Sequence, residues 1–477
     1  MEWWYGLPAL FATLLALALT GHVALVKRDP RAATLWIVVL WFMPVLGALM
    51  YLLFGVNRIQ RRASSLNRPI WPPRGQALPS SHAAALRLAV GPGHAHLTEL
   101  AELVTRVTHL PLLAGNTIQT LVDGDGAFPE MLAAIDAARC SVTLSTYIFG
   151  NDRVGRAFCD ALARARVRGV QVRVLVDAAG ERYSWPPMVP VLQGVGITVA
   201  RFFPGRRASW LVGLNLRNHR KLLVCDGRLG FIGGMNLRVH HCQNSGRRFT
   251  QDLHFRVEGP VVRQLQEMFA QDWAFAAGEN LDGESWFPPI LHPAGAVFCR
   301  AVPDGPDENL DKLSWVLLGA LSVAKRRIRI MTPYFLPDRS LINALNLAAL
   351  RGVEVDILLP AHNNLPFVHW AMMGQLWQVL GHGCRVWFST GAFDHSKLMV
   401  VDQTWVFLGS ANWDPRSLRL NFEGNLECYD SRLAVALDEL VAARIRMARP
   451  CSLAEVDARS LPIKLRDGIA RLFTPFL

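Results

Sequence analysis

The sequence predicts an α/β protein made of two duplicated halves that share one site on a pseudo-twofold axis, preceded by a two-helix transmembrane hairpin. Three observations support this prediction. The chain opens with two long uncharged stretches, a strand–helix–strand pattern occurs twice, and a short motif of His, Lys and Asp occurs twice at one spacing. With 477 residues, 51% of them hydrophobic, the chain is long enough for two or three full-sized cores.

The predicted hairpin rests on residues 7–26 and 32–56, which contain no Asp, Glu, Lys or Arg. Each stretch is long enough to cross a hydrocarbon core of about 30 Å as a helix. A cleaved signal peptide is the alternative, but the first six residues carry no Lys or Arg and a second span follows at once. We therefore expect residues 1–56 to stay attached as a membrane hairpin, with a tolerated kink at Pro44.

The charge pattern indicates the partners and the side of the membrane. A net charge of +12 and a pI of about 9.7 favour nucleic acid or an anionic membrane, and behind a membrane hairpin anionic lipid is the simpler partner. The arginines after the second span favour the cytoplasm for the bulk of the chain, although the basic loop between the spans argues the other way. Eight scattered cysteines without a CxxC pair indicate a reduced compartment rather than a disulfide frame or a zinc site.

The rest of the chain divides by composition. A stretch rich in Arg, Pro and Ser follows the hairpin, a short helical segment comes next, and an α/β pattern begins near Leu113. The region 275–300 is the expected link between the halves. The predicted segments are a transmembrane hairpin at 1–56, a juxtamembrane linker with a docking helix at 57–108, a first half at 109–280 and a second half at 281–477.

The internal repeat is visible in residues 141–177 and 328–360. Each is a short β-rich run, a turn that contains Tyr, an amphipathic helix, the tripeptide RGV (168–170 and 351–353) and a buried strand. Apolar runs on either side of a helix predict βαβ units in a mostly parallel sheet.

The duplicated motif reads His-x-Lys-x₄-Asp, as His219, Lys221 and Asp226 and again as His395, Lys397 and Asp402. Residues two apart on a strand point to the same face, so each His shares a face with its Lys. The Asp is seven residues beyond the His, and in the first copy Gly227 follows it, which is a hairpin-turn signal. All six residues are candidate catalytic residues, and the two Asp residues are also expected to hold strand ends or turns.

Each motif has companions at matched positions. Asn236 and Asn412 both lie seventeen residues after their His, in clusters of small residues that allow close backbone approach. One acid follows each Asn: Asp252 and Glu423. A carboxylate on the Nδ1–H of an imidazole would fix its tautomer and leave Nε2 free to attack.

Two sets of His, Lys, Asn and acid, one in each half, suggest one shared site in which the two imidazoles have different roles. One would attack phosphorus while the other protonates the leaving alkoxide, and the lysines and asparagines would hold the non-bridging oxygens. The lysines supply positive charge, so no metal and no cofactor are expected. A single His-x-Lys is common and a lone His is usually structural, but duplication with matched companions argues against that interpretation here.

These residues resemble the phospholipase D superfamily, whose signature is HxKxxxxD with a following GxxN-type segment in two copies. The resemblance implies a covalent phosphohistidine, with His219 as nucleophile and His395 as general acid and base. It also implies that Asp252 and Glu423 orient the histidines.

The chain also resembles the bacterial cardiolipin synthases over nearly its whole length. The similar segments are RNHRK, FIGGMN, DLHFRVEGPVV, FAQDWAF, TPYFLPD, LGSANWDPRSLRLNFE and the terminal RLFTPFL. This resemblance implies a multi-pass protein of the bacterial inner membrane that joins two phosphatidylglycerols into cardiolipin and releases glycerol. The sequence departs from the family in LRVHHCQNSGRRF, after GGMN, and in Phe249, which stands near a family Trp, so the choice of head group stays open.

Several alternatives stay open. A lipid hydrolase would use water as the acceptor, and phosphatidylethanolamine could serve as second donor. A nuclease could use the same motifs, but the membrane anchor and the lack of a sustained basic and aromatic track argue against it and against nucleic acid as a partner. A non-catalytic lipid-binding protein would not need two complete motifs. The oligomeric state is not predicted.

Residues around the motifs supply two further expectations. Six arginines flank them and could bind lipid phosphates: Arg217, Arg220, Arg247, Arg248, Arg416 and Arg419. The apolar stretch 210–212 could dip into the membrane interface or could equally belong to the core. The stretch 365–380 is apolar enough to be an acyl-chain surface, but its stripe of Met and Trp is more typical of ordinary core.

Overall fold

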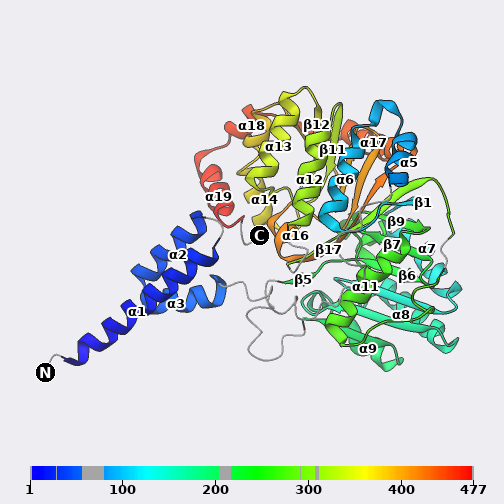
Figure 1. The fold of residues 1–477 in the computed structure, drawn as a ribbon, viewed down its shortest axis with the longest axis horizontal. Helices are drawn as coiled ribbons and strands as arrows, with labels where there is room; N and C mark the ends of the chain where they lie inside the picture. Colours follow the sequence, from blue (N-terminus) through cyan, green and yellow to red (C-terminus); the bar gives the residue numbers. More distant parts are fainter. Residues whose placement is uncertain are drawn as a thin grey trace. The chain divides into compact units, whose positions relative to one another are not determined.

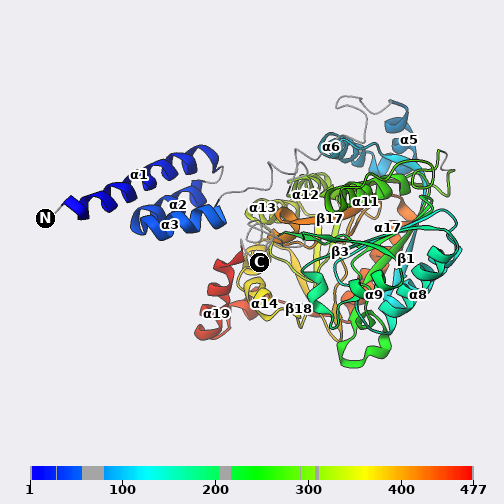
Figure 2. The same cartoon turned by 90° about the horizontal axis from the view of Figure 1, so that it is seen from below.

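The computed structural model describes residues 3–27, 30–55, 80–203, 216–289, 292–306 and 311–474. These residues divide into two units, an N-terminal unit of residues 3–55 and a main unit that contains the remaining described residues. Figures 1 and 2 show both units, and each is described by itself.

The N-terminal unit contains one helix that is long and apolar enough to span a membrane, with its most apolar window at Ala9–Val26. The predicted second span is not one helix. It forms α2 (Pro30–Phe42), α3 (Pro44–Met50) and a π-helical turn (Tyr51–Gly55), and the 13 residues of α2 rise only about 20 Å. Among the described residues, one helix is therefore long and apolar enough to span a membrane, and the second predicted span is interrupted at Pro44, where the sequence predicted a kink.

Pro44 is the cause of this break. Proline disfavours helical geometry in the residue before it, and Met43 has φ −137° and ψ 67°. The chain then folds back so closely that a Cβ on Gly47 would lie 2.5 Å from the carbonyl oxygen of Val39. Tyr51 is fully buried, and its hydroxyl lies 2.8 Å from Nδ1 of His22 on α1 (Trp3–Val26), which joins the helices through a polar contact.

The main unit is organised around one large sheet whose strand order repeats about its centre. From the centre outward, the first half contributes β1 (Leu113–Val122), β9 (Leu253–Glu258), β7 (Leu229–Gly233), β6 (Leu222–Cys225), β2 (Ser141–Thr146), β3 (Gln171–Asp177) and β4 (Thr198–Phe202). The second half contributes β10 (Val297–Asp304), β17 (Asn421–Tyr429), β16 (Trp405–Gly409), β15 (Leu398–Val401), β11 (Arg327–Met331), β12 (Glu354–Pro360) and β13 (Arg385–Ser389), with β18 (Arg449–Cys451) at the edge. The strands β1 and β10 pair antiparallel at the centre, so the order supports the predicted duplication with a pseudo-twofold axis.

Helices cover both faces of this sheet. One face packs against α11 (Val262–Ala277) and α17 (Ser431–Arg446), one helix from each half, in a shared apolar core. The other face is covered separately in each half. In the first half the covering helices are α7 (Asp123–Ala137), α8 (Arg153–Val167) and α9 (Met188–Gly194), and in the second they are α12 (Lys312–Val323), α13 (Arg339–Leu350), α14 (Pro366–Met373) and α15 (Trp377–Leu380).

The predicted βαβ units are present, as β2–α8–β3 and β11–α13–β12, and both strand pairs are parallel. The expectation of a mostly parallel sheet is wrong, however. Along the main strand order, parallel pairing is confined to β2–β3–β4 and β11–β12–β13. The hairpins β6–β7 and β15–β16, whose first strands lie inside the two motifs, add antiparallel neighbours to each βαβ unit.

The helices before the first half pack on the second half. The helix α6 (Leu97–Thr108) packs against α12, and Figures 1 and 2 show the two helices side by side. The helix α5 (Ser80–Val90) contacts α6 and adds Leu86 and Val90 to the same apolar core. The fully buried Arg300 on β10 fixes α6, because it donates to the carbonyl oxygens of Ala101 and Leu110 while it pairs with the buried Glu427 on β17. Within the segment 57–108, the helices α5 and α6 thus belong to the apolar core of the second half, while residues 57–79 lie outside the described residues.

We expect Arg300→Ala to destabilise the protein by about 3–5 kcal/mol, because removing one partner leaves a buried charge unpaired. The matched control is Arg106→Ala, since Arg106 pairs with Glu102 on the exposed face of α6 and such pairs contribute about 0–1 kcal/mol. Thermal unfolding of the detergent-solubilised protein measures both. Equal melting temperatures for the two variants would contradict the role given to Arg300.

Candidate active site

Two short strand pairs cross between the halves and position the histidines. The strand β5 (Arg217–Asn218) pairs with Asn421–Phe422 of β17, and the N–H of His219 donates to the carbonyl oxygen of Phe422 at 2.9 Å. By the same arrangement β14 (Phe393–Asp394) pairs with β8 (Thr250–Gln251), and the N–H of His395 donates to Gln251 at 2.8 Å. Each histidine is therefore held by the strand that leads to or carries the acid of the other half.

The carboxylates contact the histidines across the halves. Nδ1 of His219 lies 3.0 and 3.1 Å from the two oxygens of Glu423, and Nδ1 of His395 lies 2.8 Å from Oδ2 of Asp252. Both acids are fully buried. Since a carboxylate only accepts, each Nδ1 carries the proton and each Nε2 is left for chemistry.

The two lysines are buried beside these pairs. Nζ of Lys221 donates to the carbonyl oxygen of His219 at 2.6 Å, and Nζ of Lys397 donates to that of His395. Burial lowers the pKa of Lys221 to about 7 and that of Lys397 to about 8, against attraction from the nearby carboxylates and, for Lys221, with repulsion from Lys397. The site thus holds two ammonium groups that are close to losing their protons.

Burial and the nearby lysines also lower the pKa values of the two histidines. The pKa of His219 is lowered by burial, opposed by attraction from Glu423, and the pKa of His395 is lowered well below its ordinary value by burial and by Lys397 and Lys221. Nζ of Lys397 lies 2.9 Å from Nδ1 of His395. Because that nitrogen already donates to Asp252, this contact acts as repulsion on the imidazolium.

The two acids sit in different surroundings. Glu423 accepts from the hydroxyls of Ser410 and Ser417 and from the amide of Asn421. Burial alone would raise the pKa of Glu423, but His219, its hydrogen bond and Lys221 lower it to about 2.

Asp252 has fewer donors, of which one is the backbone N–H of Leu253. At the position that matches Ser410 stands Gly234, where a Cβ would lie 2.4 Å from Oδ1 of Asp252. Burial raises the pKa of Asp252 to about 6, although Lys397 opposes this. The site is therefore twofold in geometry and asymmetric in charge.

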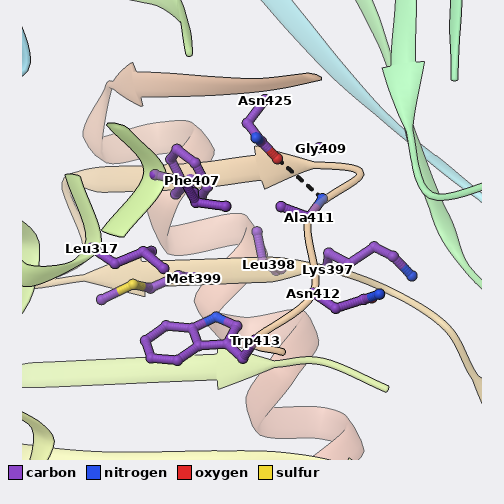
Figure 3. Close-up of a pocket in the computed structure, with 11 residues that line it drawn as sticks. Leu317, Lys397, Leu398, Met399, Phe407, Gly409, Ala411, Asn412, Trp413 and Asn425 are labelled. Carbon is purple, nitrogen blue, oxygen red and sulfur yellow. Dashed lines mark hydrogen bonds between the residues drawn. The ribbon is translucent and has the colours of Figure 1, made fainter. Parts of the chain in front are cut away.

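The two asparagines border the site from equivalent loops. Oδ1 of Asn236 accepts the N–H of Ile148 at 3.0 Å, whereas Oδ1 of Asn412 is buried without a hydrogen-bond partner among the described residues. Figure 3 shows the side chains of Asn412 and Lys397 next to each other at the edge of a small cavity, with the hydrogen bond between Asn425 and Ala411 above them in the view. The amide of Asn412 thus keeps hydrogen-bonding capacity.

Two tyrosines complete the site, and they had not been proposed as site residues from the sequence. The ring of Tyr147 contacts the ring of His219 edge-on at 5.4 Å, and Tyr334 contacts His395 in the same way at 6.3 Å. Nζ of Lys221 also lies 5.6 Å from the centre of the Tyr147 ring. The signal was available, because both tyrosines occupy the same position in the repeated strand–turn–helix pattern.

Asp226 and Asp402 lie away from the histidines, which corrects their inclusion among the catalytic residues. Asp226 accepts the N–H groups of residues 139–141 at the start of β2, and Asp402 accepts those of residues 325–327 at the start of β11. Both have positive φ, 54° and 50°, which Asp tolerates in turns. No hydrogen bond among the described residues joins either to His219 or His395, so they hold the turn and strand ends in place.

The flanking arginines do not all face the site. Arg220 is buried and pairs with Asp272 at 2.6 Å, so it is a structural residue and not a phosphate ligand. Arg419 lies on the surface near Asp338. The side chains of Arg247 and Arg248, and the apolar stretch 210–212, lie outside what the structure describes.

Among the described residues we find neither a disulfide bond nor a cluster of metal ligands. All eight cysteines are free thiols, and seven of them are buried. In the parts of the chain that the structure covers, no group of three or more His, Cys, Asp or Glu side chains is arranged to hold a metal ion.

Comparisons with known proteins agree with this geometry. A family model described as "Cardiolipin synthase, PLD-like domain" matches residues 131–273 and 317–444, one segment in each half. A second, described as "Phospholipase_D-nuclease N-terminal", matches residues 14–55.

Curated relatives extend the similarity over most of the chain. The chain is 32% identical to the major cardiolipin synthase ClsA of Bacillus subtilis, covering 94% of this chain and 95% of that protein. It is 29% identical to a cardiolipin synthase of Staphylococcus aureus, covering 94% and 92%. The crystal structure of phosphatidylserine synthase from Haemophilus influenzae has the same fold, with a TM-score of 0.62 and 15% identity over 80% of this chain and all of that one. The chain therefore belongs to the cardiolipin synthase family, with a duplicated phospholipase D-like fold.

Proposed function

We propose that the chain is a membrane-bound phosphatidyltransferase that joins two phosphatidylglycerols into cardiolipin and releases glycerol. Membership of the family supports the reaction class. One geometric observation carries the mechanism: two imidazoles each have Nδ1 held by a buried carboxylate of the other half, beside two buried lysines. We further propose that the protein lies in the bacterial inner membrane with its main unit in the cytoplasm.

In the first step Nε2 of His219 attacks the phosphorus of one lipid. A nitrogen–phosphorus bond forms, the bond from phosphorus to the glycerol oxygen breaks, and that oxygen takes the Nε2 proton of His395. The assignment of His219 as nucleophile is supported by Glu423, whose lowered pKa keeps it anionic and able to stabilise the positive charge that develops on the ring.

In the second step the hydroxyl of another phosphatidylglycerol attacks the same phosphorus. Its proton passes to Nε2 of His395, the nitrogen–phosphorus bond breaks, and His219 is restored. His395 is thus the general acid in the first step and the general base in the second, as microscopic reversibility requires. The proton that it gives to glycerol is replaced by the proton of the second lipid.

Lys221 and Lys397 hold the non-bridging oxygens, together with Asn236 and Asn412. In this site, burial and mutual repulsion lower the pKa values of the lysines and histidines. The phosphodiester brings a negative charge into the site. Its arrival raises their pKa values, so substrate binding itself favours the ammonium groups and the imidazolium of His395.

The test is a lipid assay with the full-length protein in detergent micelles and phosphatidylglycerol as sole lipid. We expect cardiolipin and glycerol in equal amounts. Phosphatidic acid as the main product would instead identify a lipid hydrolase, the second candidate. Adding phosphatidylethanolamine, with release of ethanolamine as the readout, tests it as an alternative donor.

We expect kcat/KM to show a bell-shaped dependence on pH. The pKa of Asp252 is raised to about 6, so its carboxylate is lost as the pH falls below that value. The pKa of Lys221 is lowered to about 7, that of Lys397 to about 8 and that of His395 well below its ordinary value, so these three cations are lost as the pH rises. Lys221→Arg should slow the enzyme and move the basic limb upward, and a basic limb unchanged in that variant would contradict the assignment.

A further inference from the structure

The C-terminal helix α19 (Leu461–Leu472) is amphipathic, but its apolar face is exposed and its acidic residue is buried. It buries a carboxylate, because Asp467 is 1% exposed, and it leaves its large apolar residues in the open. The exposed fractions are 68% for Leu461, 57% for Leu465, 56% for Ile469 and 71% for Leu472. These residues are four, four and three apart, so they lie along one face of the helix.

Ion pairs fix the orientation of this helix. Asp467 pairs with Arg459 and, at 2.8 Å, with Arg466. The backbone of α19 at Asp467 also lies so close to the end of α14 that a Cβ on Gly374 would meet the Asp467 carbonyl oxygen at 2.6 Å. The helix therefore cannot roll its leucines inward without breaking the ion pair with Arg459, which precedes the helix, and the close contact at Gly374.

The apolar face of α19 continues onto α14, and Figures 1 and 2 show the two helices side by side. Phe473, which follows α19, contacts Phe367 of α14 edge-on at 5.7 Å, and both rings are partly exposed. We call this surface the α14–α19 patch, defined by Leu365, Phe367, Leu461, Leu465, Ile469, Leu472 and Phe473.

The patch is continuous with the wall of the active site. Leu365, which is exposed, directly follows Asn364, whose Oδ1 accepts the hydroxyl of Tyr334 at 2.8 Å. Tyr334 in turn contacts His395. Two residues, Asn364 and Tyr334, thus join the apolar surface to one of the two histidines.

The charges around the patch indicate what covers it. Lys464, Arg466 and Arg471 lie on α19 beside its apolar stripe, and the acid of the helix, Asp467, is turned inward. An apolar stripe edged by basic side chains fits the boundary of an anionic bilayer, in which the acyl region takes the leucines and the lipid phosphates take the cations.

We propose that the α14–α19 patch is a bilayer-docking surface of the main unit, separate from the N-terminal helix, which brings the His395 side of the site to the membrane. The inference needs only that the substrate is a membrane lipid, and it holds for transfer and for hydrolysis alike. An acyl-chain surface within 365–380 had been one expectation from the sequence, but α19 had not been identified.

The test places an NBD fluorophore on Leu465→Cys in the full-length protein. A Cys140→Ser background removes the one exposed native thiol, and Val167→Cys, an exposed apolar position at the end of α8, is the matched control. The proteins are reconstituted into vesicles of phosphatidylcholine with phosphatidylglycerol that contain a spin-labelled lipid. We expect quenching several-fold stronger at 465 than at 167, and weaker quenching at 465 when phosphatidylglycerol is left out.

Activity separates this inference from the proposed function. The double variant Leu465→Ser, Leu472→Ser should lose several-fold in rate on vesicles and keep its rate in detergent micelles, where lipid reaches the site without a bilayer. Equal quenching at 465 and 167 would overturn the proposal. So would cross-linking of Leu465→Cys between two chains without quenching, because a second copy would then cover the patch.

Discussion

The variants His219→Gln and His395→Gln are both expected to lose about 10⁴-fold or more in the rate of cardiolipin formation. The first removes the atom that bonds to phosphorus, and the second removes the proton donor for the leaving glycerol. Both side chains are largely buried and each makes one acid contact, so the measurement includes melting temperature beside initial rate. His382→Gln, at an exposed position, is the control and should keep full activity.

An activated substrate separates the two histidines. With a phosphatidyl ester of p-nitrophenol the leaving group departs as an anion and needs no general acid. We therefore expect His395→Gln to release a burst of nitrophenolate as the phosphoenzyme forms, and His219→Gln to release none. A burst from the His219 variant alone would reverse the assigned roles, and normal turnover of phosphatidylglycerol by either variant would rule out the shared site.

The second large effect is expected for Glu423→Gln, with a loss of about 10³- to 10⁴-fold. The amide removes the negative charge opposite the His219 ring and can favour the wrong tautomer by donating to Nδ1. Asp252→Asn should lose less, because Asp252, with its raised pKa, gives a weaker anion to His395.

The informative measurement is the ratio of the rate losses in Glu423→Gln and Asp252→Asn. Glu102→Gln, on the exposed face of α6, controls for the loss of one carboxylate elsewhere. If Asp252→Asn were the slower of the two, Glu423 would not be the partner of the nucleophile. If both variants lost stability in proportion to rate, the acids would act on folding and not on the imidazoles.

Much of the fold could be predicted because it repeats. Two similar βαβ patterns and two identical spacings of His, Lys and Asn leave little choice except a duplicated α/β unit with a shared site. Each Lys lies beside its His, since Lys221 donates to the carbonyl oxygen of His219 and Lys397 to that of His395. The prediction that each pair lies on a strand is wrong, because these four residues fall between strands, after β5 and β14 and before β6 and β15.

Other features depend on contacts that a linear pattern does not contain. Each histidine contacts the acid of the other half because β5 pairs with β17 and β14 pairs with β8. Each of these pairings involves only two residues of each strand. The inclusion of Asp226 and Asp402 among the catalytic residues failed because their spacing matches a motif, while their side chains reach backward to the start of a neighbouring strand. The break at Pro44 was expected only as a tolerated kink, since hydropathy measures composition and not the path of the backbone.

The crossed strand pairs have a consequence for the order in which the protein is made. Glu423 follows its partner His219 by 204 residues, and His395 follows Asp252 by 143. A ribosome that has completed the first half has therefore produced a histidine without its acid and an acid without its histidine. Such a nascent chain can already be inserted at the membrane by its first helix, among its own substrates, yet it cannot cleave them. By the proposed mechanism, lipid chemistry begins only when β17 has been synthesised and has paired with β5.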